Sequence, residues 1–307
     1  MMTIHCAFSS DDNYLQHLTV AITSLLENNR QHAFVLHVVH NDANAAKLAM
    51  LAEHVAGYPN AELRLYAFDD APYRHFRLDA HITLASYFRL FLTSILPPDI
   101  DRILYLDADI VVLNDVAPLW ELPFDGKLIA AVPNLFSQNN ERLGLPADYC
   151  YFNAGILVVD LDGWRREGLL ERFVDYVERN HLILRWHDQD ALNAVLHERV
   201  KYLDYGWNFQ ARTKVTDIAT LPIDEAGFQR LQQRPNIVHF TTERKPWFYA
   251  HKVAYETEYL KYLKLTPWRS YVPPDKNLKG WTARVFPRAP HYYWELKRRL
   301  SLLRPQS

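Results

Sequence analysis

The stretch YLDADIVVLND, residues 105–115, decides the fold prediction because two carboxylates interrupt what is otherwise an apolar, buried strand. Alternate side chains of a strand point the same way, so Asp107 and Asp109 would face one spot. Two like charges that close repel each other, and burying them is unfavourable or shifts their pKa. A divalent cation resolves this conflict, and carboxylates suit Mg²⁺ or Mn²⁺. The alternative is a strand end whose aspartates cap a turn or meet lysines.

Apolar strands and amphipathic helices alternate on both sides of this stretch. The pattern predicts strands at 3–9, 33–39, 62–68, 101–107, 127–133, 154–161 and 236–242, and helices at 14–29, 43–56, 83–96, 168–180 and 188–197. Such alternation is typical of an α/β fold with a mostly parallel sheet and helices on both faces. Ligands of these sheets bind beyond the carboxyl ends of the strands, where SSDDN (9–13) and the two aspartates are expected.

Composition divides the chain into an acidic body and a basic end. Of its 307 residues 49% are hydrophobic, which suits one large domain with an appendage. The net charge of −2 hides an asymmetry, because residues 266–307 carry nine Lys or Arg and only two Asp or Glu. Five of the 17 prolines fall in 266–290. We therefore expect a catalytic domain at 1–265 and a basic, aromatic C-terminal segment at 266–307.

The C-terminal segment interleaves aromatic and basic side chains: Trp281, Phe286, Tyr292, Tyr293 and Trp294 with Arg284, Arg288, Lys297, Arg298, Arg299 and Arg304. This mixture favours an anionic membrane surface, so the segment is predicted to associate with membranes. A nucleic-acid patch or a solvated tail is the alternative, and no nucleic-acid partner is expected.

Several bulk features indicate a cytoplasmic protein. Cys6 and Cys150 lie in apolar stretches and form no disulfide framework, which favours a reducing compartment. The N-terminus shows no signal-peptide pattern, and no apolar run approaches the roughly 20 residues of a membrane-spanning helix.

With nine glycines and neither GxGxxG nor GxxxxGK[ST], the chain would need a metal and basic side chains to neutralise a diphosphate.

Five motifs occur in order over most of the first 250 residues: AFSSDDNY (7–14), YLDADIVV (105–112), YFNAGILVVDLDGWR (151–165), HDQDALN (187–193) and HFTTERKPW (239–247). Together they resemble glycosyltransferase family 8, retaining enzymes of the GT-A fold. Within that family the likeness is to bacterial lipooligosaccharide galactosyltransferases and lipopolysaccharide-core hexosyltransferases. The resemblance implies a Rossmann-like nucleotide-sugar-binding fold, a UDP-hexose donor and Mn²⁺, with Mg²⁺ possible. A lipid-linked oligosaccharide acceptor would place the protein on the cytosolic face of the inner membrane.

In the first motif, the resemblance assigns nucleotide binding to Ser9, Asp11, Asn13 and Tyr14. Asp11 would contact uracil, Asn13 the ribose, and the ring of Tyr14 would stack on the base. Carboxylate and amide groups bind polar edges and aromatic rings stack on bases, which agrees with this assignment. The alternative is that Asp11 or Asp12 caps the following helix.

The resemblance makes Asp107 and Asp109 the metal pair, with Ala108 between them at the donor, and His239 the third ligand. An imidazole added to two carboxylates favours Mn²⁺ over Mg²⁺. Lys245 would contact the diphosphate and stabilise the leaving UDP. A histidine in an apolar strand can instead be a core residue, but KPW follows His239 at the family spacing.

Three further motifs complete the implied donor site. Arg89, in the apolar segment SYFRLFL, would lie against the donor, although such an arginine can also extend to the surface. Asn153 and Ala154 of FNAG would bind the donor sugar, unless they form a turn. Asp188 and Gln189 would flank the anomeric carbon, unless Asp188 only caps a helix.

Retention of configuration requires a covalent intermediate or attack from the leaving-group face. Gln189 is a poor nucleophile, and Asp188 is expected to hold the sugar, so same-face attack is favoured. Thr242 departs from the family, whose members often have glycine there, which puts the phosphate contacts in doubt.

Three alternatives remain: a haloacid-dehalogenase-type phosphatase, a nucleotide-sugar or glycan binder without activity, and a glycogenin-like self-glucosylating protein. The phosphatase needs a later GDxxxD-like acidic pair, which the sequence lacks.

Overall fold

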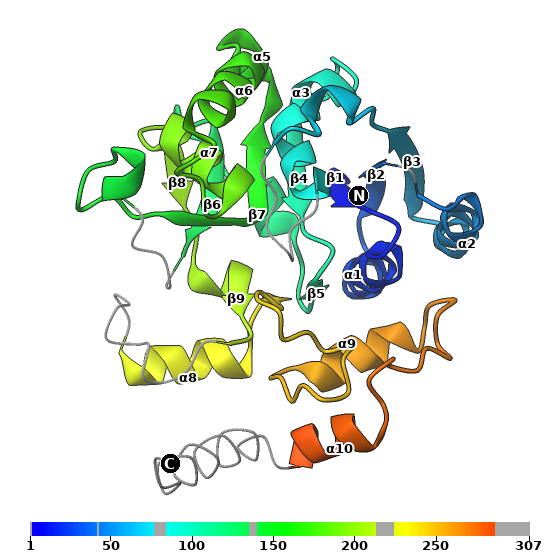
Figure 1. Ribbon diagram of the computed structural model, residues 1–307. Coiled ribbons are helices and arrows are strands. Elements are labelled where there is room, and N and C mark those ends of the chain that lie inside the picture. Colours follow the sequence, from blue (N-terminus) through cyan, green and yellow to red (C-terminus); the bar gives the residue numbers. More distant parts are fainter. Residues whose placement is uncertain (1, 42, 77–83, 135–139, 213–223, 286–307) are drawn as a thin grey trace, which may run out of the picture.

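The computed structural model describes residues 2–41, 43–76, 84–134, 140–212 and 224–285. At its centre is a seven-stranded sheet in the order β3-β2-β1-β4-β7-β6-β8 (Figure 1). The strands are β1 (Thr3–Ser10), β2 (Ala33–His40), β3 (Ala61–Ala67), β4 (Arg102–Leu106), β6 (Ile129–Pro133), β7 (Phe152–Asp160) and β8 (Val200–Tyr202). Only β7 runs antiparallel to its neighbours, β4 and β6. The predicted mostly parallel α/β sheet is therefore confirmed.

Helices cover both faces of this sheet because successive strand residues enter two different cores. Leu104 and Leu106 pack with one core and Ile103 and Tyr105 with the other. The first core contains residues of α1 (Leu15–Asn28), α2 (Ala45–Ala56) and α4 (Ala117–Trp120). The second contains residues of η2 (Leu84–Phe91), α3 (Leu92–Ile95), α5 (Leu161–Arg166), α6 (Leu169–Asn180) and α7 (His187–Leu196). Figure 1 shows α5, α6 and α7 on the opposite side of the sheet from α1.

The prediction of one strand across 105–115 is wrong. Strand β4 ends at Leu106, residues 107–109 form a turn, and β5 (Ile110–Val112) joins a second sheet with β10 (Ile237–His239) and β9 (Phe209–Gln210). In this sheet β10 is antiparallel to β5 and parallel to β9. The aspartates therefore lie at the turn between two sheets, where main-chain direction changes.

The predicted helix at 83–96 also differs, since residues 84–91 form a 3₁₀ helix and only 92–95 are α-helical. Arg89 offers a physical reason. Its Nε donates to the carbonyl of Ser86, which in an α-helix would accept the amide of Leu90. The Arg89 side chain thus competes for the carbonyl that an α-helical hydrogen bond from Leu90 would use. The remaining predicted helices and strands overlap observed ones, with shifted ends, and Pro97 follows the end of α3 as expected.

The remaining elements are η1 (Ala71–Tyr73), η3 (Glu141–Leu143), η4 (Tyr205–Asn208), α8 (Glu225–Gln233), α9 (Glu256–Leu263) and α10 (Leu278–Val285). Helix α10 belongs to the C-terminal segment, and it is tied to the body. Arg284 forms two hydrogen bonds with Glu256 and donates to the carbonyls of Tyr249 and His251. The carboxylate of Asp275 accepts the amides of residues 249 and 250. Residues 266–285 therefore contact the loop that follows Lys245.

Candidate active site

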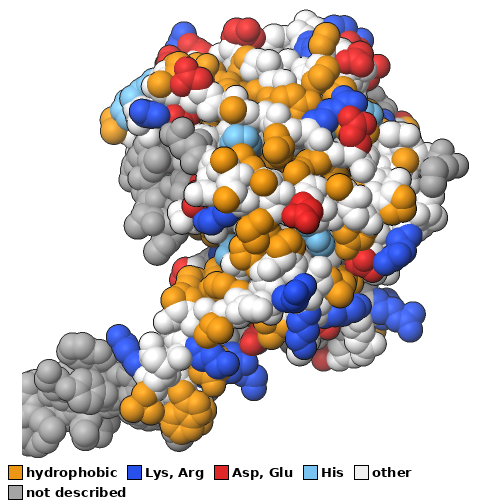
Figure 2. Space-filling model, turned by 90° about the vertical axis from the view of Figure 1, so that its right-hand side faces the viewer, with side chains coloured by type: hydrophobic (Ala, Val, Ile, Leu, Met, Phe, Trp, Pro, Cys, Tyr) orange, Lys and Arg blue, Asp and Glu red, His pale blue; other side chains and the backbone are white. Residues whose placement is uncertain are grey.

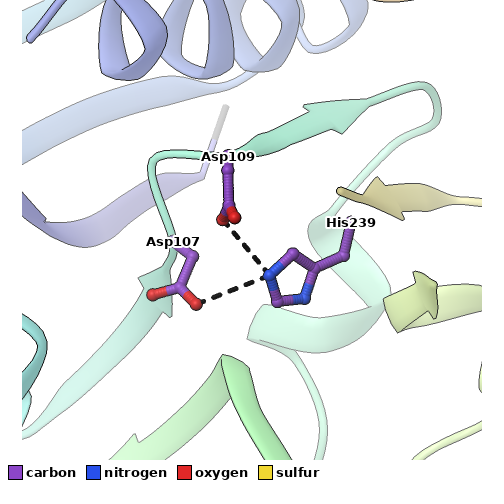
Figure 3. A group of neighbouring side chains, drawn as sticks. All are labelled: Asp107, Asp109 and His239. Carbon is purple, nitrogen blue, oxygen red and sulfur yellow. Dashed lines mark ion pairs between the residues drawn. The ribbon is translucent and has the colours of Figure 1, made fainter. Parts of the chain in front are cut away.

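Asp107, Asp109 and His239 converge where the two sheets meet (Figure 3). The Nε2 atom of His239 lies 3.6 Å from Oδ2 of Asp107 and 3.2 Å from Oδ1 of Asp109. One potential ligand atom from each residue falls within 4.8 Å of the others. The turn at 107–109 supplies the carboxylates, and antiparallel pairing of β10 with β5 places His239 opposite Ile110. The predicted convergence is confirmed, although a turn rather than strand alternation produces it.

Gly155 makes room for this cluster. Strand β7 runs antiparallel to β4, so its beginning lies beside the end of β4, and the Asp107 amide donates to the Gly155 carbonyl at 2.8 Å. A Cβ atom at position 155 would stand 2.2 Å from Cε1 of His239 and 2.8 Å from Oδ2 of Asp107. Any side chain here would collide with two of the three candidate ligands. The glycine of FNAG is therefore required by the packing.

Arg89 is buried between the metal-binding candidates and the predicted sugar-binding residues. Its guanidinium pairs with Asp107 at 2.9 Å and Asp188 at 3.0 Å, and also donates to the carbonyl of Ala154. Burial alone would lower the pKa of Arg89, but the two carboxylates hold it above its usual range. The guanidinium carbon also lies over the ring of Tyr105, 4.6 Å from its centre. Arg89 therefore stays charged inside the protein and does not extend to the surface.

The electrostatic environment of the two aspartates differs. Burial raises the pKa of Asp107, although Arg89 acts in the opposite direction. Burial would also raise the pKa of Asp109, but Lys245 and His239 together hold it below its usual range. The ammonium of Lys245 lies 2.5 Å from Oδ2 of Asp109 and 2.7 Å from the carbonyl of Phe240. Lys245 thus lies beside the three candidate metal ligands.

Asp188 and Gln189 lie at the start of α7, next to Arg89 and β7. Burial raises the pKa of Asp188 to about 6, against the attraction of Arg89. Oε1 of Gln189 accepts from Nδ2 of Asn153 and from the Ala154 amide, both at 3.0 Å. Neither side chain caps α7. Asp190, inside the helix, uses its Oδ2 to accept the amides of residues 185 and 186, which lie before the first helical residue.

The predicted nucleotide-binding residues border the same cluster. In the parallel register of β1 and β4, Ala7 lies opposite Tyr105, and Ser9 and Asp107 each follow two residues later. Burial raises the pKa of Tyr14, and the charges of Asp109, Asp11 and Asp107 add to this effect, so its phenol lies near them. Oδ1 of Asp11 also accepts the amides of residues 13 and 14 in the turn before α1, whose N-cap Tyr14 makes no side-chain capping hydrogen bond. Asp12 binds Lys47 and the amide that precedes α2 instead.

Two observations concern the predicted nucleotide-binding residues and the departure from the family at Thr242. Asn13 is exposed, whereas Trp247 of KPW is buried and its ring lies edge-on to Tyr14 at 5.7 Å. Thr242 has φ of 78°, a left-handed conformation that glycine adopts most easily. The chain therefore keeps a glycine-like backbone at the position where it departs from the family.

Sequence reasoning did not identify several polar residues that organise this site. Tyr151 bridges Gln189 and Asp190, and Arg142 pairs with Asp190 at 2.9 Å. Asn208 contacts both Asn153 and His239. Tyr151 belongs to a quoted motif, but neither Arg142 nor Asn208 falls in one.

The donor atoms fit a hard divalent cation. Two carboxylates and one imidazole match the ligand types of Mn²⁺, and the Gly155 cradle gives them close approach. Three carboxylates line the site against two cations: Asp107, Asp109 and Asp188 against Arg89 and Lys245. With these groups charged and His239 neutral, one negative charge is left unbalanced. A divalent cation would reverse that sign and create a site for an anionic diphosphate.

Comparison with known proteins identifies the family. The sequence profile described as Glycosyl transferase family 8 matches residues 5–251. General stress protein A of Bacillus subtilis is 30% identical over 285 residues, covering 89% of this chain and 98% of that protein. Lipopolysaccharide 1,2-glucosyltransferase of Escherichia coli is 27% identical over 286 residues, covering 89% and 81%. The chain belongs to glycosyltransferase family 8.

The structural comparison agrees with this assignment. The crystal structure of galactosyltransferase LgtC in complex with donor and acceptor sugar analogs matches with a TM-score of 0.75 at 25% identity. The match covers 90% of this chain and 98% of that one. The predicted GT-A fold and the predicted family resemblance are both confirmed. The protein is a glycosyltransferase, so the phosphatase alternative is not supported.

Proposed function

We propose that this protein is a retaining hexosyltransferase that moves galactose or glucose from a UDP-hexose to a hydroxyl of a lipopolysaccharide or lipooligosaccharide core acceptor. Mn²⁺ is the proposed cofactor, with Mg²⁺ as a weaker substitute. The names of two similar proteins, a lipopolysaccharide glucosyltransferase and a galactosyltransferase, support this substrate class. The observation that carries the proposal is the convergence of Asp107, Asp109 and His239 beside Lys245.

The side chains present have distinct roles in this reaction. Asp107, Asp109 and His239 would hold the cation, which supplies Lewis-acid stabilisation of the departing diphosphate when bound. Lys245, 2.5 Å from Asp109, can exchange that partner for a phosphate oxygen and add positive charge to the leaving group. Arg89 keeps Asp107 and Asp188 in fixed positions through its two ion pairs.

The contacts of Gln189 and Asp188 favour same-face attack. Both hydrogen bonds to Oε1 of Gln189 come from fixed groups of β7, and a neutral amide oxygen is a weak nucleophile. Asp188 is held by Arg89, which reduces the availability of its carboxylate. Neither side chain is therefore well prepared for a covalent intermediate. In the proposed mechanism the leaving phosphate takes the proton of the acceptor hydroxyl, while Asp188 and Asn153 hold the donor sugar.

We also propose that the C-terminal segment binds an anionic membrane and so presents the active site to a lipid-linked acceptor. Leu278, Trp281 and Val285 are exposed on α10 with helical spacing, on a helix that Arg284 anchors to the body. Figure 2 shows hydrophobic side chains beside Lys and Arg side chains at the lower end of the molecule. The other predicted membrane-contact residues lie in 286–307, outside the described residues. No helix within the described part of the chain is long and apolar enough to span a bilayer.

The test is UDP release from a panel of UDP-hexoses by the metal-depleted protein, with Mn²⁺, Mg²⁺ or neither added. We expect release with UDP-galactose or UDP-glucose that requires the metal and increases with deacylated lipopolysaccharide core. The anomeric configuration of the product, measured by NMR, should match that of the donor. Metal-independent release, or none with any UDP-hexose, would contradict the proposal. Hexose found on a protein tyrosine by mass spectrometry would instead identify a glycogenin-like self-glucosylating protein.

A further inference from the structure

A line of two asparagine side chains joins His239, the proposed metal ligand, to Gln189. Asn208 lies 2.9 Å from Nδ1 of His239 and, through its other amide atom, 2.7 Å from Oδ1 of Asn153. Nδ2 of Asn153 continues the line to Oε1 of Gln189 at 3.0 Å. All four side chains are buried. Hydrogen bonds in such a line constrain one another, because each amide has one accepting and one donating end.

Two main-chain groups of β7 determine which way the line points. The Gly155 amide lies 3.0 Å from one end of the Asn153 side chain, and the Ala154 amide lies 3.0 Å from one end of Gln189. A main-chain N–H can only donate, so both side-chain ends must be oxygens. Asn153 then directs its NH₂ group toward Gln189. Its oxygen is left for Asn208, which must approach it with its own NH₂ group.

The orientation of Asn208 in turn determines which nitrogen of the His239 imidazole carries the hydrogen. Its remaining amide atom is the oxygen, which accepts from Nδ1 of His239, so Nδ1 carries a hydrogen. Nε2 is then the nitrogen available as a metal ligand, and it is the one that faces Asp107 and Asp109. The carboxylates alone would favour the opposite arrangement, because a hydrogen on Nε2 could donate to Asp109 at 3.2 Å.

From this geometry we infer that Asn208 is a positioning residue, which keeps the hydrogen of His239 on Nδ1 and leaves Nε2 for the metal. The Gly155 amide fixes the orientation of the Asn153 side chain, and Asn153 in turn fixes the orientation of Asn208. The Ala154 amide orients Gln189 in the same way. Neighbouring main-chain groups of β7 therefore orient both the proposed metal ligand, through Asn153 and Asn208, and the amide of the predicted sugar site. This inference rests on the metal site proposed above. Outer hydrogen bonds of this kind are commonly worth roughly 10- to 100-fold in metal affinity.

Two substitutions separate the accepting function of Asn208 from its packing. Asn208→Leu has a similar size and no acceptor, so it should weaken Mn²⁺ binding roughly 10- to 100-fold, measured by electron paramagnetic resonance without donor. Asn208→Asp keeps an acceptor for Nδ1 but turns a second oxygen toward Oδ1 of Asn153, so it should weaken Mn²⁺ binding clearly less than Asn208→Leu does. Should Asn208→Leu not fold, Asn208→Ala removes the same acceptor without adding bulk.

A second measurement observes the hydrogen itself. In metal-free protein labelled with nitrogen-15 histidine, His239 should give a slowly exchanging Nδ1–H signal, assigned by its absence in His239→Gln. The signal should persist in Asn208→Asp and disappear in Asn208→Leu. Asn29→Leu is the matched control, because Asn29 is fully buried with three main-chain hydrogen bonds but contacts α1 and the end of β5. This control should lose stability and keep both the signal and the Mn²⁺ affinity.

Three results would overturn the inference: wild-type Mn²⁺ affinity in Asn208→Leu, equal weakening in the Leu and Asp variants, or an Nδ1–H signal that survives in Asn208→Leu. Failure of the proposed function looks different. If the wild type bound no Mn²⁺, the metal site would be refuted, while the Nδ1–H signal would still test Asn208.

Discussion

Substituting Gly155 with alanine should disable the metal site by adding a single methyl group. The new Cβ would lie 2.2 Å from Cε1 of His239, whereas ordinary contacts begin at 3.4 Å. Either the imidazole or β7 must therefore move by about 1.2 Å. Metal–ligand distances tolerate only about 0.2 Å, so even a small share of that displacement spoils the coordination. We expect Mn²⁺ affinity to fall by at least roughly 10-fold.

The methyl group will also destabilise the fold, so a matched control is needed. Overpacking of a buried position typically costs about 1–3 kcal/mol. Gly163 offers a comparable clash. It lies in the first turn of α5, which follows the other end of β7. A Cβ there would lie 2.5 Å from both Asp160 and Leu128. Gly163→Ala should therefore lose similar stability without disturbing the metal ligands.

Thermal unfolding with and without Mn²⁺ measures both effects in one experiment. A ligand at 100 times its Kd stabilises the native state by about 2.7 kcal/mol, which appears as a rise in Tm. Gly163→Ala should have a lower Tm but keep the Mn²⁺-dependent rise, whereas Gly155→Ala should lose most of it. If both variants showed the wild-type rise, the cluster of Asp107, Asp109 and His239 would not be the metal site.

Three further changes test other parts of the structure. Asp109→Asn should abolish Mn²⁺-dependent UDP release while leaving the circular dichroism unchanged, and full activity would contradict the metal assignment. Burial, reinforced by Lys245, lowers the pKa of His17 to about 3, so acid favours the unfolded chain, in which His17 takes up its proton near pH 6.5. His17→Gln should reduce the stability lost between pH 7 and pH 5 by about 2 kcal/mol in urea unfolding, and an unchanged loss would refute this. Deleting residues 286–307 should weaken binding to anionic vesicles, since only the apolar residues of α10 remain, but keep UDP release, because Arg284 and its contacts remain. Equal vesicle binding would show that the deleted residues are not the anchor.

Periodicity and motifs were sufficient to predict every strand of the main sheet except β8, and most of the candidate site. The central strands are apolar and flanked by amphipathic helices, so local pattern alone locates them. The spacing of Asp107 and Asp109 predicted a shared metal site, and family resemblance added His239. Those residues do converge, because polar side chains at strand ends collect at one edge of such a sheet.

The predicted strand at 236–242 overlaps β10, but the pairing of the second sheet and the inner hydrogen bonds could not be predicted in the same way. Strands β5, β9 and β10 have only two or three residues each, and their pairing joins distant parts of the chain, such as Ile110 with His239. No periodicity develops over so short a length. Asn208, in the sequence GWNFQ, resembles any polar residue near a turn. Its importance depends on partners that only the folded chain brings together.

The direction of one strand connects these separate features. Because β7 runs against the parallel strands, its first residues, not its last, lie at the carboxyl end of β4. Had β7 been parallel, its Asp160 end would lie at this edge instead. The observed direction places three groups of FNAG at the site: the bare Cα of Gly155 below the ligands, the Ala154 carbonyl on Arg89, and the amide that orients Gln189. The proposed metal site and sugar site are therefore joined through the main chain of one strand, and the clash at position 155 explains why glycine stands there.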